Sequence, residues 1–173
     1  MNHPAYLQRI NDQTGGRNDI TPLFADYAAL SALARDLAAP WRSAPVDLVA
    51  GIDAFGFILG TTVALELRKG LLVVRKGGKL PVPSDGLEFT DASRERKRLE
   101  LRKGALAPGQ RVLVVDDWIK SGAQVSAAIA LIEKQGGVIA GVASIHMEDN
   151  DHTRPLRERY ACHWLWHPEV RDG

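Results

Sequence analysis

Runs of consecutive apolar residues recur along the chain and alternate with longer stretches of helical periodicity. The clearest run covers residues 112–115, which are mostly β-branched and predict a strand buried on both faces. Further strands are predicted at residues 46–50, 71–74, 138–147 and 161–166. In the last of these, Trp164 and Trp166 are spaced to share one face. Because helical stretches separate the strands, the pattern predicts an α/β fold with a central parallel sheet flanked by helices.

Apolar residues three and four positions apart predict the helices. The first begins at Thr21, a helix cap followed by Pro22 at the first helical position, and ends before Pro40. Its inner face carries Leu30, Leu33, Ala34 and Leu37. Further helices are predicted at residues 56–68, 125–134 and, as a short helix, within 150–160. Residues 1–19 are polar and punctuated by proline and glycine, which indicates an arm with little regular structure.

Residues 82–104, which we call the ribbon, interrupt this alternation. Residues 87–89 and 99–101 alternate like two strands on either side of a polar connection. The ribbon is markedly basic, with Arg94, Arg96, Lys97, Arg98, Arg102 and Lys103. These cations indicate either a solvated surface or a mobile segment that folds over an anionic substrate.

Composition restricts the possible classes. A chain of 173 residues fits one domain, and a formal net charge of +1 gives no reason to expect nucleic acid as a partner. No apolar run approaches the length needed to span a bilayer, and the N-terminus lacks a signal-peptide core. The single cysteine, Cys162, excludes an intrachain disulfide framework. We therefore expect a cytoplasmic protein of one domain, residues 1–173, without a membrane partner.

The main candidate for chemistry is the stretch 111–124. Asp116 and Asp117 close the predicted strand, and a short loop with Ser121 and Gly122 leads into the next helix. Loop amides and the helix dipole can hold a phosphate, while the carboxylates can accept hydrogen bonds from sugar hydroxyls. The alternative is an ordinary strand-to-helix turn with two solvated aspartates.

Other charged residues are expected at the same edge of the sheet. Ligands of parallel sheets bind at the carboxyl ends of the strands, where Asp53 and Arg75 would join Asp116. Lys76 and Lys79 follow Arg75 around two glycines, so this basic loop is suited to phosphate oxygens. Without a ligand, the same loop would be a solvated turn.

Several short motifs occur in the order found in one enzyme family. The chain resembles the type I phosphoribosyltransferases, and among them the adenine phosphoribosyltransferases, from about Gly15 to its C-terminus. The motifs that carry the resemblance are Asp19-Ile20-Thr21-Pro22-Leu23, Gly51-Ile52-Asp53 with Gly56-Phe57, Arg75-Lys76 with Gly78-Lys79-Leu80-Pro81, Gly104-Ala105-Leu106 with Pro108-Gly109-Gln110-Arg111-Val112, and Val114-Val115-Asp116-Asp117.

The resemblance implies transfer of a phosphoribosyl group from phosphoribosyl pyrophosphate (PRPP) to a purine-like base in nucleotide salvage, with Mg²⁺ supplied through PRPP and no metal ligand in the protein. Asp116 and Asp117 would act on the ribose hydroxyls. Glu88 would be a further catalytic residue on a flexible flap formed by the ribbon. The resemblance also implies that the protein is a homodimer, and that residues 1–25 form an N-terminal hood over the base. The remaining PRPP-binding residues would be Asp53, Arg75, Lys76, Lys79, Lys120, Ser121, Gly122, Ala123 and Gln124, of which the last five form the loop around the 5-phosphate.

The chain also departs from the family pattern. The loop 120–124 reads Lys-Ser-Gly-Ala-Gln where the family usually has Ala-Thr-Gly-Gly-Thr, and Phe55 stands where arginine usually meets the pyrophosphate. The base pocket would use Arg17, Asn18 and, in place of a leucine, Trp118. The ribbon is longer than usual by residues 93–97, and Phe89 replaces a tyrosine. An alternative function is therefore a non-catalytic regulator that binds PRPP or a nucleotide on the same fold.

Overall fold

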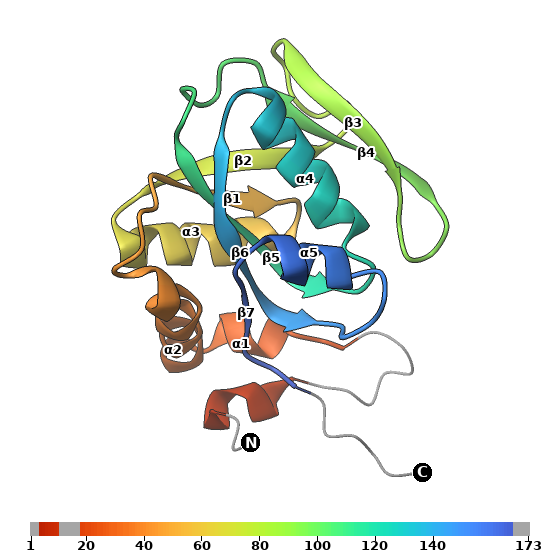
Figure 1. The fold of residues 1–173 in the computed structure, drawn as a ribbon. Coiled ribbons are helices and arrows are strands. Elements are labelled where there is room, and N and C mark those ends of the chain that lie inside the picture. Colours follow the sequence, from red (N-terminus) through yellow and green to blue (C-terminus); the bar gives the residue numbers. More distant parts are fainter. Residues whose placement is uncertain (1–3, 11–17, 168–173) are drawn as a thin grey trace.

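A seven-stranded sheet forms the centre of the protein (Figure 1). The computed structural model describes residues 4–10 and 18–167. The strand order is β3-β4-β2-β1-β5-β6-β7, in which β2, β1, β5, β6 and β7 are parallel while β3 and β4 are antiparallel. The strands are β1 Leu48–Ile52, β2 Gly70–Lys76, β3 Ser84–Thr90, β4 Arg96–Arg102, β5 Arg111–Ile119, β6 Val138–Met147 and β7 Cys162–Trp164.

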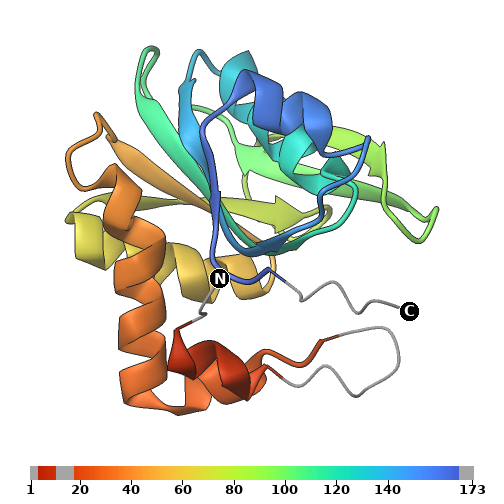
Figure 2. The ribbon, with the colours of Figure 1, turned by 60° about the horizontal axis from the view of Figure 1, so that its bottom comes forward.

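Helices cover both faces of the sheet, as the sequence predicts. Helices α4 and α5 pack on one face, and α2 and α3 pack on the other, with α1 beside them (Figures 1 and 2). The helices are α1 Thr21–Ala25, α2 Tyr27–Ala38, α3 Phe55–Leu67, α4 Ala123–Lys134 and α5 Arg154–Arg159, with two 3₁₀ helices, η1 Ala5–Arg9 and η2 Ala39–Trp41. Among the described residues, no helix has the length and apolar character needed to cross a membrane.

Strand β5 lies at the centre of the core. Val112 and Val114 pack toward α4, whereas Leu113 and Val115 pack toward α2 and α3. All four side chains are fully buried. This confirms the predicted strand with apolar partners on both faces, an arrangement that removes apolar area from water on two sides of one segment.

The acidic pair does not follow the strand but lies inside it, which corrects the prediction. Strand β1 stops pairing with β5 at Val115, whereas β6 continues to pair with β5 as far as Ile119. Asp116 and Asp117 therefore have a strand neighbour on one side only. On the other side, the start of α3 and not a strand approaches β5.

The helix predicted from Thr21 to Pro40 is two helices, α1 and α2. Thr21 is the first residue of α1 and not its cap as predicted, and its backbone N–H and hydroxyl donate to Asp19 Oδ1. Asp26 then has extended backbone angles, and its side chain accepts a hydrogen bond from Ala29 N at the start of α2. The prediction of one helix was wrong because Asp26, the cap of α2, interrupts an otherwise continuous apolar pattern.

The ribbon is a hairpin of β3 and β4 that extends the sheet. Arg75 and Lys76 on β2 pair with Glu100 and Leu99 on β4, and Leu99 is fully buried. The other end of the hairpin projects beyond the body of the protein (Figure 2). The base of the ribbon is therefore part of the core, although its composition predicts a separate excursion from the sheet.

The terminal strand is shorter than predicted. Strand β7 ends at Trp164, and the backbone N–H groups of Leu165 and Trp166 both donate to Ile145 O. As a result, Trp164 packs in the cluster on the α4 side, and Trp166 packs on the side of α2 and α3. The prediction that the two indoles share a face was wrong, because the chain leaves the strand geometry between them.

Candidate active site

Three adjacent parallel strands bring the predicted charged residues to one edge of the sheet. Asp53 follows β1, while Arg75 lies near the end of β2 and Asp116 near the end of β5. Asp53 Oδ2 lies 3.7 Å from Arg75 Nε. Neither of these buried atoms has a hydrogen-bond partner in the described part of the chain. Asp53 thus forms an ion pair with the Arg75 guanidinium, and Arg75 Nε can still donate a hydrogen bond to a ligand.

Gly56, at the start of α3, allows the helix to approach β5. A Cβ atom at Gly56 would lie 3.0 Å from Val115 O and 3.1 Å from Asp116 Oδ1. The motif Gly51 to Gly56 therefore packs directly against the acidic pair. This packing explains why glycine stands at a position where no side chain fits.

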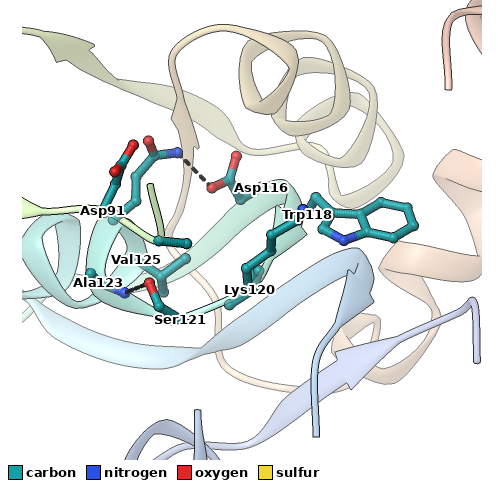
Figure 3. Close-up of a pocket in the computed structure, with 11 residues that line it drawn as sticks. Asp91, Asp116, Trp118, Lys120, Ser121, Ala123 and Val125 are labelled. Atoms are coloured by element: carbon teal, nitrogen blue, oxygen red, sulfur yellow. Dashed lines mark hydrogen bonds between the residues drawn. The ribbon is translucent and has the colours of Figure 1, made fainter. Parts of the chain in front are cut away.

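Asp116 is the most buried carboxylate of the site, with 2% of its surface exposed. Its Oδ2 accepts a hydrogen bond of 2.9 Å from Gln124 Nε2 (Figure 3). Its Oδ1 accepts one of 3.0 Å from Asp117 N. Burial, followed by the nearby negative charge of Asp117, raises the pKa of Asp116 well above its usual value. A ligand that is cationic or donates hydrogen bonds from hydroxyls would stabilise the ionised form of Asp116.

The loop 120–124 joins β5 to the N-terminus of α4. Gly122 has φ of 70°, and a Cβ atom there would lie 2.7 Å from Leu156 Cδ1, so both backbone and packing require glycine. Ala123 is the first residue of α4 and has helical backbone angles. The alanine that departs from the family pattern therefore causes no strain.

The same loop leaves donors available to an anion. Ala123 N approaches Ser121 Oγ at 3.4 Å, which is a weak contact (Figure 3). The N–H groups of the first turn of a helix have no acceptor within the helix, and the helix dipole adds positive potential there. Gln124 lies in the first turn of α4, and its side chain donates to Asp116 instead of pointing to the loop.

A cavity of about 150 Å³ lies between this loop and the turn at the end of the ribbon (Figure 3). The turn contributes Asp91 and Ala92, and the sheet contributes Asp116. Asp91, which sequence reasoning missed, accepts hydrogen bonds from Ser93 N and Ser93 Oγ. The Asp-x-Ser pattern is typical of such turns, so this signal was present in the sequence.

Trp118 lies beyond the acidic pair and projects away from the loop (Figure 3). Its ring packs 4.5 Å from the His146 ring and 5.0 Å from the Trp166 ring, measured between centroids. His146 Nδ1 lies 2.8 Å from Trp166 O, which fixes the imidazole in place. This aromatic cluster was not predicted, because it joins strands that are distant in sequence. Of the other predicted pocket residues, Asn18 is partly buried, and Arg17 lies outside the described residues.

Phe55 replaces a charge with an aromatic contact. Its ring meets the Phe24 ring edge-on, with centroids 5.4 Å apart, and 36% of Phe55 is exposed. Phe24 belongs to α1, so this contact joins the N-terminal segment to the start of α3. Phe55, at the position where the family usually has arginine, therefore packs against the N-terminal segment.

Some predicted residues lie apart from the cavity. Glu88 is exposed on β3 and pairs with Arg96 at 2.8 Å, and it does not line the cavity beside Asp116. Lys76 and Lys79 are also exposed. The structure thus brings the acidic pair and loop 120–124 together, but not Glu88.

Comparison with known proteins agrees with this geometry. Residues 25–165 match the phosphoribosyl transferase domain family. An adenine phosphoribosyltransferase of Nocardioides sp. is 47% identical over 133 residues, which cover 72% of this chain and 69% of the relative. That of Leuconostoc citreum is 36% identical over 144 residues, 83% of this chain and 81% of the relative.

Solved structures share the same architecture. The adenine phosphoribosyltransferase of Thermoanaerobacter pseudethanolicus superposes with a TM-score of 0.81 at 30% identity, covering 90% of this chain and 91% of the other. The order of motifs, the fold and the relatives all agree. This chain belongs to the type I phosphoribosyltransferase family.

Proposed function

We propose that this protein transfers the phosphoribosyl group of PRPP to adenine or a closely related purine, forming a nucleoside monophosphate and releasing pyrophosphate. The observation that carries this proposal is the position of Asp116 and Asp117 on β5, directly beside loop 120–124 and the N-terminus of α4. A ribose 5-phosphate presents hydroxyls and a phosphate, the two kinds of group that these elements can bind. The relatives described above are adenine phosphoribosyltransferases.

The acidic pair would bind the ribose. Asp117 is more exposed than Asp116 and would accept hydrogen bonds from the ribose hydroxyls. Asp116, held by Gln124, would complete the carboxylate pair. In the transition state, positive charge spreads between C1 and the ring oxygen of the sugar, and nearby carboxylates stabilise this charge.

The loop 120–124 would hold the 5-phosphate. Ser121 Oγ, the backbone of Gly122 and the first N–H groups of α4 offer hydrogen bonds, and Lys120 adds a positive charge. Arg75, with Lys76 and Lys79, would meet the pyrophosphate as it leaves, because cations stabilise the developing negative charge. Asp53 would keep the Arg75 guanidinium in position.

The base would lie on the side of Trp118. An indole offers a wide apolar face for a purine ring, and Trp118 is backed by Trp166 and His146. Asn18 and Arg17 would complete the pocket from the N-terminal hood. Glu88 would reach the substrate only if the ribbon moves as a flap, which would also keep water from the reactive sugar.

Magnesium would enter with PRPP. Mg²⁺ in phosphate-transfer sites is usually held by one or two carboxylates, by substrate oxygens and by water, and it would neutralise charge on the pyrophosphate. Among residues 4–10 and 18–167, no three His, Cys, Asp or Glu side chains form a metal-binding group. We therefore propose that PRPP and water hold the ion, while Asp116 and Asp117 bind the ribose hydroxyls.

A homodimer is part of the proposal. Helix α3 is apolar on its outer side as well as its inner side, with Ile58 39% and Leu65 72% exposed. Val73 on the neighbouring β2 is 38% exposed. Because exposed large apolar side chains favour an interface, a second copy of the chain would cover this face near the Arg75 loop. We expect the enzyme to work in the cytoplasm.

The alternative function, a non-catalytic regulator, is not favoured. The two features that suggest it are the altered sequence of loop 120–124 and the replacement of the usual arginine by Phe55. Ala123 has helical angles, and both enzyme relatives described above share more than a third of the aligned residues. We therefore expect turnover.

The test combines binding and turnover. The purified protein is incubated with PRPP, Mg²⁺ and a panel of purines and pyrimidines, and pyrophosphate release is measured for each base. We expect the highest kcat/KM with adenine and no release by Asp117→Asn. PRPP that raises the melting temperature but is consumed with no base would refute the transferase proposal.

A further inference from the structure

Two departures from the family pattern meet in one cavity. Lys120 begins the altered loop, and Arg94 belongs to the extra residues of the ribbon. Both residues line a cavity of about 610 Å³ between the end of the ribbon and the segment after β6. Since a water molecule has about 30 Å³ in the liquid, this space corresponds to about 20 waters. It is larger than one phosphate group needs.

This larger cavity adjoins the smaller one beside the acidic pair. The two cavities share Lys120, Ser121 and the ribbon residue Asp91. Asp116 and Gln124 line only the smaller cavity. A phosphate bound by loop 120–124 would therefore lie between the ribose and the larger cavity.

Basic side chains line the larger cavity from three segments. Arg94 comes from the turn of the ribbon, Lys120 from the end of β5, and His152 from the segment before α5. The segment before α5 is fixed to the loop, because Asn150 Nδ2 donates to Lys120 O at 3.0 Å. These three side chains, of which Arg94 and Lys120 are cationic, are thus held around one space by different parts of the chain.

Two carboxylates, Asp91 and Glu148, also line the cavity. Asp91 forms an ion pair with Lys97, which together with Ser93 keeps the pKa of Asp91 well below its usual range. Glu148 Oε1 lies 3.8 Å from His146 Nε2. The cavity is therefore lined by both signs of charge: Asp91 is paired within the ribbon, and Arg94 and Lys120 contribute positive charge.

We infer that this cavity is a second oxyanion subsite, next to the 5-phosphate position, which takes a further phosphate-type group. The inference rests on the proposed function, because that function places the 5-phosphate on loop 120–124. The group could be carried on the 5-phosphate itself, as in a nucleoside 5′-diphosphate. It could also be free inorganic phosphate that binds beside a nucleoside monophosphate.

Calorimetric titration with adenosine 5′-monophosphate (AMP) and 5′-diphosphate (ADP), without Mg²⁺, tests the inference. A third titration uses AMP in the presence of inorganic phosphate. We expect ADP, or AMP with phosphate, to bind about tenfold more tightly than AMP alone, the effect of one charge-assisted contact. A gain in affinity with ADP would show that the second anion is carried on the nucleotide. A gain with AMP and inorganic phosphate would show that it is a free phosphate.

Arg94→Gln should remove this gain and leave the affinity for AMP alone unchanged, because Arg94 lines only the larger cavity. The matched control is Arg102→Gln, an exposed arginine at the other end of β4, which should keep the gain. A gain that survives Arg94→Gln, or no gain from either anion while AMP binds, would overturn the inference and leave the proposed function standing. Failure of both AMP and PRPP to bind would refute the proposed function, and the subsite with it.

Discussion

At the scale of single residues, the site combines burial with like charge. Asp116 is held between Gln124, Gly56 and the charge of Asp117, and these surroundings raise its pKa. Because the folded state then binds a proton more tightly than the unfolded chain, folding stability falls as pH rises above the unfolded pKa of about 3.9. At neutral pH the carboxylate therefore costs stability, a cost that the proposed role of Asp116 in binding ribose would explain.

Asp116→Asn should accordingly raise the melting temperature of the ligand-free protein at pH 7.5 and weaken PRPP binding. The amide removes the buried charge, and the gain in melting temperature should vanish near pH 4, where the unfolded carboxyl also becomes protonated. Melting curves between pH 4 and pH 8 measure the effect. The control, Glu158→Gln, removes an exposed carboxylate on α5 and should show no such gain. A wild-type protein as stable as the Asn variant at pH 7.5 would show that Asp116 carries no penalty.

Phe55→Arg tests the position that usually carries a charge. If this position faces the pyrophosphate, the added guanidinium should lower KM for PRPP by about tenfold. The same change breaks the contact with Phe24, so Phe55→Leu serves as the control that loses the ring without adding charge. Steady-state kinetics with varied PRPP give the result. Equal KM values in both variants would mean that the β1–α3 turn follows a different path from that of the family.

At the scale of elements, the ribbon is fastened at its base. Gln135, just after α4, donates from Nε2 to Asp85 Oδ2 and to Arg102 O, and its Oε1 accepts from Ala105 N. Lys134 adds an ion pair to Asp85 of 2.7 Å. These contacts join both strands of the hairpin to α4, so any flap movement must occur beyond them, toward the turn.

Gln135→Ala should loosen the whole hairpin. We expect faster hydrogen–deuterium exchange in residues 84–102 and a lower kcat, because a flap without a fixed base closes less often over the substrate. Gln8→Ala changes an exposed glutamine of η1 and is the matched control. Exchange rates that stay the same in the ribbon would show that Gln135 does not anchor it.

Elements also show what the sequence could predict. Apolar runs predicted each strand of the parallel sheet, because residues buried on both faces leave a continuous pattern. The capping by Asp26 and the extension of β5 to Ile119 were missed, since one depends on a local side-chain contact and the other on where β1 stops pairing. The motifs predicted that the acidic pair and loop 120–124 lie together, and the structure brings them to one edge of the sheet. They could not show that Gln124 turns toward Asp116, which depends on packing across the loop.

At the scale of the whole molecule, the uncovered face of α3 indicates assembly. Leu65→Glu should convert the proposed dimer into monomers, because a charge would enter an apolar interface without a partner. Sedimentation velocity measures the change. Tyr27→Glu, at an 86% exposed position of α2, is the control and should leave the dimer intact. A wild-type protein that sediments as a monomer at micromolar concentration would contradict the proposed interface.

The most direct test of the proposed function follows the reaction of PRPP with adenine and Mg²⁺ by ³¹P nuclear magnetic resonance. We predict that AMP and pyrophosphate appear in equal amounts with the wild-type protein, and that neither appears with Asp117→Asn, which should remain folded. PRPP that binds the wild-type protein but persists unchanged in the presence of adenine and other purines would contradict the proposed function.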